Sequence, residues 1–173
     1  MGINNSHSGN ISVRSKNPDS VIITRSGSML GNLTINDLVE TSLKPNPVTD
    51  KTASRELVVH RSIYEMSSKT AVIHSHPPSA IALSLKYDCV KPIDAEGGYY
   101  FPGGVKVIDV ENAIASAEVA EKVAPLLARE NIVIVRGHGT FAACEDLERC
   151  FLYTTTLESA SRVLINYINI SKS

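Results

Sequence analysis

The chain has 173 residues, of which 43% are hydrophobic and 20% are charged, and its formal net charge is -1. This length and composition are typical of a globular protein with its own core, so we expect a single domain over residues 1–173. A net charge near zero argues against general electrostatic binding to nucleic acid or to an anionic membrane. Without an apolar run of membrane-spanning length, a secretory signal pattern or a Cys-x-x-Cys spacing, the sequence favours a cytoplasmic protein.

The N-terminal part of the sequence predicts a β-hairpin. Residues 11–14 and 21–24 have the alternation or β-branched content of strands, and the Asn-Pro-Asp-Ser segment at 17–20 between them has turn chemistry. Beyond the hairpin we expect a short helical turn, an extended loop with two prolines and a helix with apolar residues at helical spacing, at residues 34–39, 43–50 and 52–66.

Two histidines follow a short apolar run in the middle of the chain. Residues 71–73 lead into His74 and His76, and two prolines then stop the strand. Side chains at positions i and i+2 of a strand point to the same face, so these two imidazoles are expected to lie side by side. Neutral imidazole nitrogen is a ready ligand for zinc, which makes the pair a candidate half of a metal site.

The C-terminal half alternates between helical and strand patterns. Residues 132–135 form an unbroken β-branched run, which is typical of a strand that is covered on both faces. The remaining expected elements are a helix at 79–86, strands at 90–92 and 105–110 around a loop at 94–104, and helices at 111–130 and 145–168.

His138 is the natural third ligand for such a metal site. It comes shortly after the buried-looking strand and is flanked by glycines, which let the backbone turn and approach a neighbour closely. Three histidines with one open position are a common catalytic zinc arrangement. The alternative is that all three are polar residues at strand ends that hydrogen-bond to backbone. His60 is expected to be a packed, hydrogen-bonded helix residue, and His7 a loop residue.

Two further kinds of polar site have both a functional and an ordinary interpretation. Glu56 is either a solvated carboxylate at a helix start or a general acid/base beside the metal, where charge and burial would tune its protonation. Three short polar pairs at turns or helix starts are either ordinary turns or phosphate-binding groups, because backbone N–H groups, hydroxyls and guanidinium groups bind phosphate. These pairs are Gly9-Asn10, Ser26-Gly27 and Ser54-Arg55.

The order and spacing of five sequence blocks resemble the class II aldolase/adducin family over nearly the whole chain. The blocks are residues 9–14, residues 23–27, residues 54–56 with His60, residues 74–77 and residues 137–139. The resemblance implies an α/β fold with three layers, α/β/α, in which helices cover a mostly antiparallel central sheet. It also implies a cyclic homotetramer with active sites at the subunit interfaces.

The same resemblance assigns roles to the candidate residues. It implies one Zn²⁺ ion per subunit, held by His74, His76 and His138. Glu56 would ligate the metal in the resting enzyme and then swing away to move a proton when substrate binds. The phosphate of a small phosphorylated sugar would be bound by Gly9, Asn10, Ser26, Gly27, Ser54 and Arg55.

The glutamate at the acidic position resembles the aldolases of the family rather than its epimerases, which have aspartate there. The resemblance therefore favours an aldehyde-lyase that cleaves a ketose 1-phosphate similar to L-fuculose 1-phosphate into dihydroxyacetone phosphate and a small aldehyde such as L-lactaldehyde. A methylthioribulose-1-phosphate dehydratase, a pentulose-5-phosphate 4-epimerase and a non-catalytic adducin-like interaction module are the alternatives. Asp94, Tyr99 and Tyr100 are the candidates for protonating the leaving oxygen.

Overall fold

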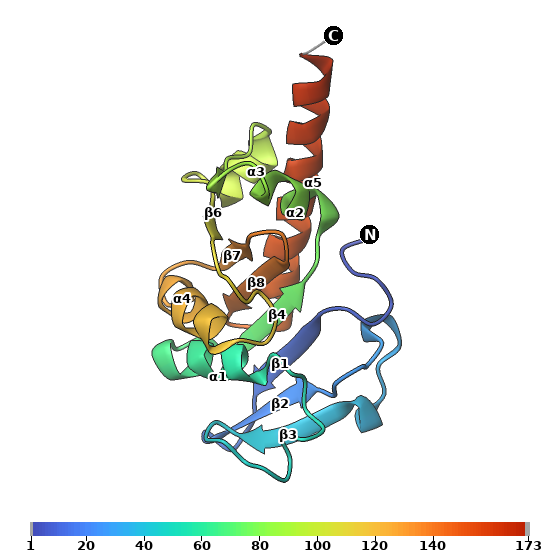
Figure 1. The fold of residues 1–173 in the computed structure, drawn as a ribbon, viewed down its shortest axis with the longest axis vertical. Coiled ribbons are helices and arrows are strands. Elements are labelled where there is room, and N and C mark those ends of the chain that lie inside the picture. The colour runs from blue at the N-terminus through green and yellow to red at the C-terminus, as the bar shows by residue number, and fades with distance from the viewer. Residues whose placement is uncertain (1, 172–173) are drawn as a thin grey trace.

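The computed structural model describes residues 2–171 and contains an eight-stranded sheet with helices packed against it (Figure 1). The strands are β1 (Asn10–Arg14), β2 (Ser20–Thr24), β3 (Leu38–Ser42), β4 (Ala71–Ser75), β5 (Cys89–Val90), β6 (Val105–Ile108), β7 (Ile132–Val135) and β8 (Gly139–Cys144). The helices are α1 (Leu57–Met66), α2 (Pro78–Ser84), α3 (Ala95–Tyr100), α4 (Ala117–Leu127) and α5 (Leu147–Ile170), with short 3-10 turns η1 (Leu30–Asn32) and η2 (Ile35–Asp37). Within the described part of the chain, none of the helices combines the length and apolar character needed to cross a bilayer.

The sheet is mixed, which corrects the expectation of a mostly antiparallel one. Its strand order is β3-β2-β1-β4-β8-β7-β6-β5. Hairpin neighbours such as β1 and β2 or β7 and β8 run antiparallel, whereas β6 and β7 run parallel. The parallel pair arises because helix α4 lies between β6 and β7 in the sequence, and a parallel connection needs such a crossover.

The predicted N-terminal hairpin is confirmed and sets the position of the metal-site strand. Strands β1 and β2 pair in antiparallel register, with Val13 opposite Ile22. The other edge of β1 pairs with β4, and this register places Asn10 directly opposite His74. Opposed residues of an antiparallel pair have Cβ atoms about 4.5–5.5 Å apart, so the first residue of the hairpin lies beside the first histidine.

The core consists of two apolar clusters that share the central strands. Along β7, which was predicted to be covered on both faces, Val133 and Val135 belong to one cluster and Ile132 and Ile134 to the other. These four residues are 0–5% exposed, which confirms that prediction. Buried residues of α1 and α4 join the first cluster, and those of α2 and α5 join the second. Successive strand residues face opposite sides, so this division follows from the pleat.

Several element boundaries differ from the sequence-based expectations. The helix expected at 52–66 begins only at Leu57, because the preceding turn is held by a bridge between Ala53 and Arg25. The helix expected at 111–130 is limited to α4, whose first turn is capped by Ser116. The expected loop at 94–104 contains helix α3, and strands β3 and β8 were not predicted. Strand β8 was not predicted because all its residues are buried, and its Gly-Thr-Phe-Ala-Ala-Cys sequence shows no alternation of apolar and polar residues.

Candidate metal and substrate site

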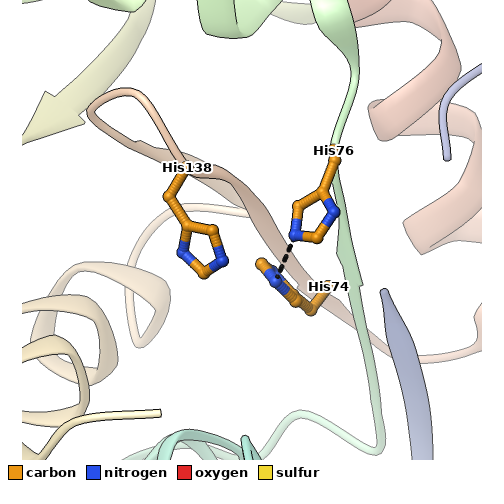
Figure 2. Close-up of side chains that lie close together, drawn as sticks. All are labelled: His74, His76 and His138. Carbon is orange, nitrogen blue, oxygen red and sulfur yellow. Dashed lines mark hydrogen bonds between the residues drawn. The ribbon is translucent and has the colours of Figure 1, made fainter. Parts of the chain in front are cut away.

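Three histidines meet where strand β4 ends and where β7 turns into β8. His74 lies on β4, His76 follows two residues later, and His138 lies in the turn between β7 and β8. Figure 2 shows the three imidazole rings facing one another. One nitrogen from each ring can be chosen so that all three nitrogens lie within 4.8 Å of one another. The structure therefore brings together the three residues that were predicted to bind a metal.

The turn that carries His138 depends on its two neighbouring glycines. Gly137 has a φ of +67°, in the left-handed region that favours glycine. A Cβ atom on Gly139 would lie 2.3 Å from the backbone oxygen of Ser75 and 2.6 Å from the ring of His76. A side chain at Gly139 would push the turn away from β4, and one at Gly137 would be strained by the backbone conformation, so the glycine-flanked histidine is a local requirement of the cluster.

The hydrogen-bond partners of the rings favour metal binding by the nitrogens that face each other. Nδ1 of His74 lies 3.0 Å from the backbone oxygen of Thr140, so this nitrogen carries the hydrogen and donates it. Nε2 of His74 then carries a lone pair and lies 2.9 Å from Nε2 of His76. Two nitrogens bound tetrahedrally to one zinc ion are about 3.3 Å apart, close to this spacing. Such a backbone partner on the far nitrogen is typical of metal-binding histidine.

Burial keeps these imidazoles neutral, which is the form that binds a metal. Desolvation, followed by the neighbouring rings of His76 and His138, lowers the pKa of His74 well below its usual value. Burial and then His76 lower the pKa of His138 to about 4. Among the described residues Nδ1 of His138 is buried without a partner in hydrogen-bonding geometry, although the backbone of Ala113 partly opposes the lowering of its pKa. The donor set thus fits a divalent cation with open coordination positions.

Glu56 is buried beside this cluster, which excludes its interpretation as a solvated carboxylate. It lies immediately before α1 and is 5% exposed. Its Oε1 accepts a 3.0 Å hydrogen bond from the backbone N–H of Ala115, whereas its Oε2 is buried and has no partner in the described part of the chain. Desolvation raises the pKa of Glu56, and the Ala115 N–H partly opposes that shift. Within residues 2–171, the tight group of metal-ligand atoms consists of the three histidines and does not include this carboxylate.

The residue that holds Glu56 has an unusual backbone conformation. Ala115 has a φ of +52°, in the left-handed region, which costs a residue with a Cβ atom about 1–2 kcal/mol. Strain of this kind persists where the surrounding structure imposes it. Here the conformation accompanies an N–H that is directed at the buried carboxylate of the candidate acid/base.

A cavity of about 270 Å³ is bordered by both the histidine cluster and Glu56. All six residues predicted to bind phosphate line this cavity: Gly9, Asn10, Ser26, Gly27, Ser54 and Arg55. They come from three separate stretches of the chain that the fold brings together. Gly9 and Gly27 have φ values of +81° and +78°, so both turns use the conformation that glycine allows.

The cavity also contains residues that sequence reasoning did not assign to it. His7, Ser8, Arg25 and Ile114 line it as well. Arg25 directly precedes the Ser26-Gly27 pair, and its guanidinium group was the available signal for an anion site. His7 was expected to be a loop residue, which it is, but its loop folds over the cavity wall. Ile114 carries no sequence signal, because only the tertiary fold brings its loop to the site.

The three candidates for protonating the leaving oxygen do not line this cavity of the described chain. Asp94 caps helix α3 by accepting a hydrogen bond from the backbone N–H of Gly97. Tyr99 is 80% exposed, and Tyr100 borders a different cavity, next to Phe101. His60, by contrast, is buried and hydrogen-bonded, as predicted.

The fold and the site together define a family. The model of the Class II Aldolase and Adducin N-terminal domain family matches residues 1–165, and the chain belongs to this family. The presence of a three-histidine cluster agrees with the metal dependence of class II aldolases.

Relatives of this chain carry several different names. The chain is 36% identical over 162 residues to a methylthioribulose-1-phosphate dehydratase of Acidiphilium cryptum, which covers 87% of this chain and 76% of the relative. It is 30% identical to an L-fuculose phosphate aldolase of Methanococcus maripaludis over 92% of this chain and 84% of the relative. The crystal structure of L-fuculose-1-phosphate aldolase from Thermus thermophilus superposes with a TM-score of 0.91 at 34% identity, covering 99% and 89% of the two chains.

Proposed function

We propose that this protein is a zinc-dependent aldehyde-lyase that cleaves and forms a ketose 1-phosphate similar to L-fuculose 1-phosphate. The products of cleavage would be dihydroxyacetone phosphate and a small aldehyde such as L-lactaldehyde. The observation that carries the proposal is the buried carboxylate of Glu56 beside three converging imidazoles, in a cavity that the predicted phosphate-binding residues also line. The chain would act as a single domain over residues 1–173, in the cytoplasm, in carbohydrate metabolism.

The metal would be held by His74, His76 and His138. When bound, the Zn²⁺ ion supplies positive charge that stabilises the negative charge developing on the ketose phosphate fragment as the carbon–carbon bond breaks. The hydrogen bond from His74 to the Thr140 carbonyl orients this ring and raises the basicity of its free nitrogen. The cluster has three nitrogen donors, which leaves coordination positions open on the cavity side.

Glu56 would move the proton. Its Oε1 is tethered by the N–H of Ala115, so the unpartnered Oε2 is the atom that would exchange a proton with the substrate carbon. Burial raises the pKa of Glu56, and a general acid/base works best when its pKa approaches the operating pH. We also propose that, before substrate binds, the carboxylate rotates toward the histidines and completes the ligand set.

The phosphate group would bind at the part of the cavity lined by the three polar pairs. Gly9 and Gly27 would supply backbone N–H groups at turns, where such groups hold anions, and Ser54 would supply its hydroxyl group. The Arg55 guanidinium adds a charge-assisted hydrogen bond, and Asn10 and Ser26 add side-chain groups. A cavity lined by both phosphate donors and metal ligands fits a short phosphorylated ketose.

We propose further that the protein is a homotetramer with active sites at subunit interfaces. Several large apolar side chains are exposed around the first half of the sheet and on α5, among them Met29, Ile35 and Phe151, which are 42%, 79% and 46% exposed. The residue that protonates the leaving oxygen is also missing from the described cavity wall of one chain, which a neighbouring subunit would supply. The two core clusters also support a layered α/β/α arrangement.

A dehydratase of methylthioribulose 1-phosphate is the second candidate function, because a relative with that name is 36% identical to this chain. The same cluster and the same Glu56 would then remove a proton and a hydroxyl group rather than break a carbon–carbon bond. A pentulose-5-phosphate 4-epimerase and a non-catalytic interaction module are further outcomes of the same test.

Product analysis of the zinc-loaded protein distinguishes these functions. With L-fuculose 1-phosphate, two fragments indicate an aldolase, whereas conversion of a pentulose 5-phosphate to its C4 epimer indicates an epimerase. One dehydrated product from methylthioribulose 1-phosphate indicates a dehydratase. The aldolase proposal requires that chelation of the metal abolishes cleavage and that added zinc restores it. No turnover of any of these substrates, together with less than one metal ion per chain after purification, would support the interaction module instead.

A further inference from the structure

A line of four buried polar side chains runs from the interior of the protein to the cavity. The hydroxyl oxygen of Tyr64 lies 2.8 Å from Oγ of Ser12, and this Oγ lies 2.6 Å from Nδ1 of His60. Nε2 of His60 lies 2.6 Å from Oδ1 of Asn10, which borders the cavity. The four residues are between 0% and 6% exposed. We call this line the Tyr64–Asn10 network.

Each hydrogen in the Tyr64–Asn10 network can be assigned in turn, starting from the Tyr64 hydroxyl group. Among the described residues, Ser12 is the hydrogen-bond partner of the Tyr64 hydroxyl. A buried hydroxyl hydrogen without an acceptor is costly, so Tyr64 donates to Ser12. Ser12 must then donate its own hydrogen to Nδ1 of His60. The reverse order would leave the Tyr64 hydrogen with no acceptor.

The protonation of the His60 ring determines which atom of Asn10 takes part in the next hydrogen bond. Burial lowers the pKa of His60 to about 3, so the ring carries a single hydrogen at neutral pH. Because Nδ1 accepts from Ser12, the hydrogen is on Nε2 and is donated to Oδ1 of Asn10. The carboxamide oxygen of Asn10 is thereby occupied, and its amino group is left for the cavity.

The orientation of this carboxamide decides which ligands the wall attracts. An amino group donates hydrogen bonds to phosphate oxygens, whereas a flipped carboxamide would present its own oxygen and repel them. Asn10 lies among the Ser26-Gly27 pair and Arg55 on the cavity wall, all of which offer donors. We propose that Tyr64, Ser12 and His60 are positioning residues that hold the amino group of Asn10 toward the cavity and so select an anionic substrate group. This inference rests on the proposed function, in which a phosphate binds at this wall.

The first test is the tautomer of His60 in the zinc-loaded protein. Nitrogen-15 spectra of histidine-labelled protein distinguish a hydrogen on Nε2 from one on Nδ1, and loss of one signal in His60→Gln assigns the residue. We expect a neutral ring with its hydrogen on Nε2 between pH 5 and pH 8, because the pKa of about 3 lies well below this range. A hydrogen on Nδ1 would overturn the inference without touching the proposed function.

The second test removes the Ser12 hydroxyl group, which donates the hydrogen bond to His60. In Ser12→Ala the His60 ring has no partner on Nδ1, so both orientations of the Asn10 carboxamide become comparable in energy. We expect inorganic phosphate to bind about 3–10-fold more weakly by calorimetry, and the KM for the phosphorylated ketose to rise by a similar factor while kcat falls less. Thr154→Ala is the matched control, because it removes a fully buried hydroxyl whose 2.8 Å hydrogen bond to the Cys150 carbonyl lies outside the network.

The outcomes separate this inference from the proposed function. Equal losses of phosphate affinity in Ser12→Ala and Thr154→Ala would overturn it, because a general loss of packing would then suffice. A fall in kcat with an unchanged KM would also overturn it. Wild-type protein that binds no inorganic phosphate would contradict both the inference and the proposed phosphate wall.

Discussion

Two groups of histidines differ in how their hydrogen-bonding capacity is used. On helix α1, His60 has a side-chain partner at each ring nitrogen and is fully buried. At the strand ends, Nε2 of His74 and Nε2 of His76 face each other at 2.9 Å, and within residues 2–171 Nδ1 of His138 has no partner in hydrogen-bonding geometry. Both environments lower the pKa of their imidazoles by burial, so protonation does not distinguish them.

The two groups differ in whether every buried ring nitrogen has a hydrogen-bond partner among the described residues. Buried polar atoms are nearly always hydrogen-bonded, so an unpartnered atom beside converging imidazoles indicates that a further species completes the site. Among the described residues, Nδ1 of His138 and Oε2 of Glu56 are two such atoms in this region. The hydrogen bonds of His60 hold its neighbours in place, whereas the three-histidine cluster with Glu56 has atoms that can bind a further species. Four experiments test this distinction.

The largest effect is expected from removing a ring of the cluster. His74→Ala should reduce zinc affinity by more than the about 10–100-fold that loss of an outer-shell partner costs, because a direct ligand is lost. His60→Gln is the matched comparison, since it removes a buried imidazole whose two nitrogens both have hydrogen-bond partners and should keep one zinc ion per chain. Metal content after dialysis, measured by mass spectrometry, checks both variants. Equal metal loss in the two would mean that the comparison does not identify ligands.

Replacing the buried carboxylate should separate binding from chemistry. Glu56→Gln keeps the shape and the acceptor for the Ala115 N–H but cannot exchange a proton, so turnover should fall by about 10²–10⁴-fold. The zinc content should remain close to that of the wild type, because three imidazoles persist. Steady-state rates together with metal analysis check this expectation. Turnover within an order of magnitude of the wild type would remove Glu56 from the proposed mechanism.

The neutral histidines should make the metal-free protein less stable in mild acid. The pKa of His138 is about 4 and that of His60 about 3 in the folded protein, against about 6.5 in the unfolded chain. As the pH falls below 6.5 the unfolded state takes up protons that the folded state does not, so the free energy of unfolding decreases until the folded pKa is reached. Each histidine contributes at most about 1.4 kcal/mol per pH unit, and less at the partly exposed His138.

Urea denaturation of chelator-treated protein between pH 7.5 and pH 5 measures this dependence. The raised pKa of Glu56 acts in the opposite direction, because the folded carboxyl group binds a proton more readily than the unfolded one. The Glu56→Gln background therefore isolates the contribution of the histidines and should show a steeper loss of stability in acid. Saturating zinc should delay the loss to lower pH, since a bound cation competes with protons for the rings.

The sequence pattern predicted the elements whose signal is local. The i, i+2 spacing of His74 and His76 followed from strand geometry, and the glycines around His138 indicated a close turn. The hairpin of β1 and β2 was predicted from alternation and turn residues, and it is confirmed. Burial of Glu56 was not visible in its local sequence, and only the resemblance to a family gave it a functional role.

Features that depend on tertiary packing were not predicted. Strand β8 has no alternation because both of its faces are covered, and the parallel pairing of β6 with β7 depends on a distant crossover. His7 and Ile114 reach the cavity only through the path of their loops. The left-handed backbone of Ala115 is likewise hidden, because alanine is not a residue type that indicates this conformation.

The smallest expected effect concerns the partner of Glu56. Ala115→Gly relieves a strain of about 1–2 kcal/mol at a φ of +52° but adds about 0.5–1 kcal/mol of unfolded-state freedom, so the protein should become more stable by up to about 1.5 kcal/mol. Ala113→Gly, in the same loop but without a positive φ, should instead lose stability, because only the cost in unfolded-state freedom and a packing contact of its methyl group remain. Urea denaturation of both variants measures the difference. If Ala115→Gly also lowers turnover, the strained backbone of Ala115 is required to position the Glu56 carboxylate. The strain then contributes to the function of the site rather than to the stability of the fold.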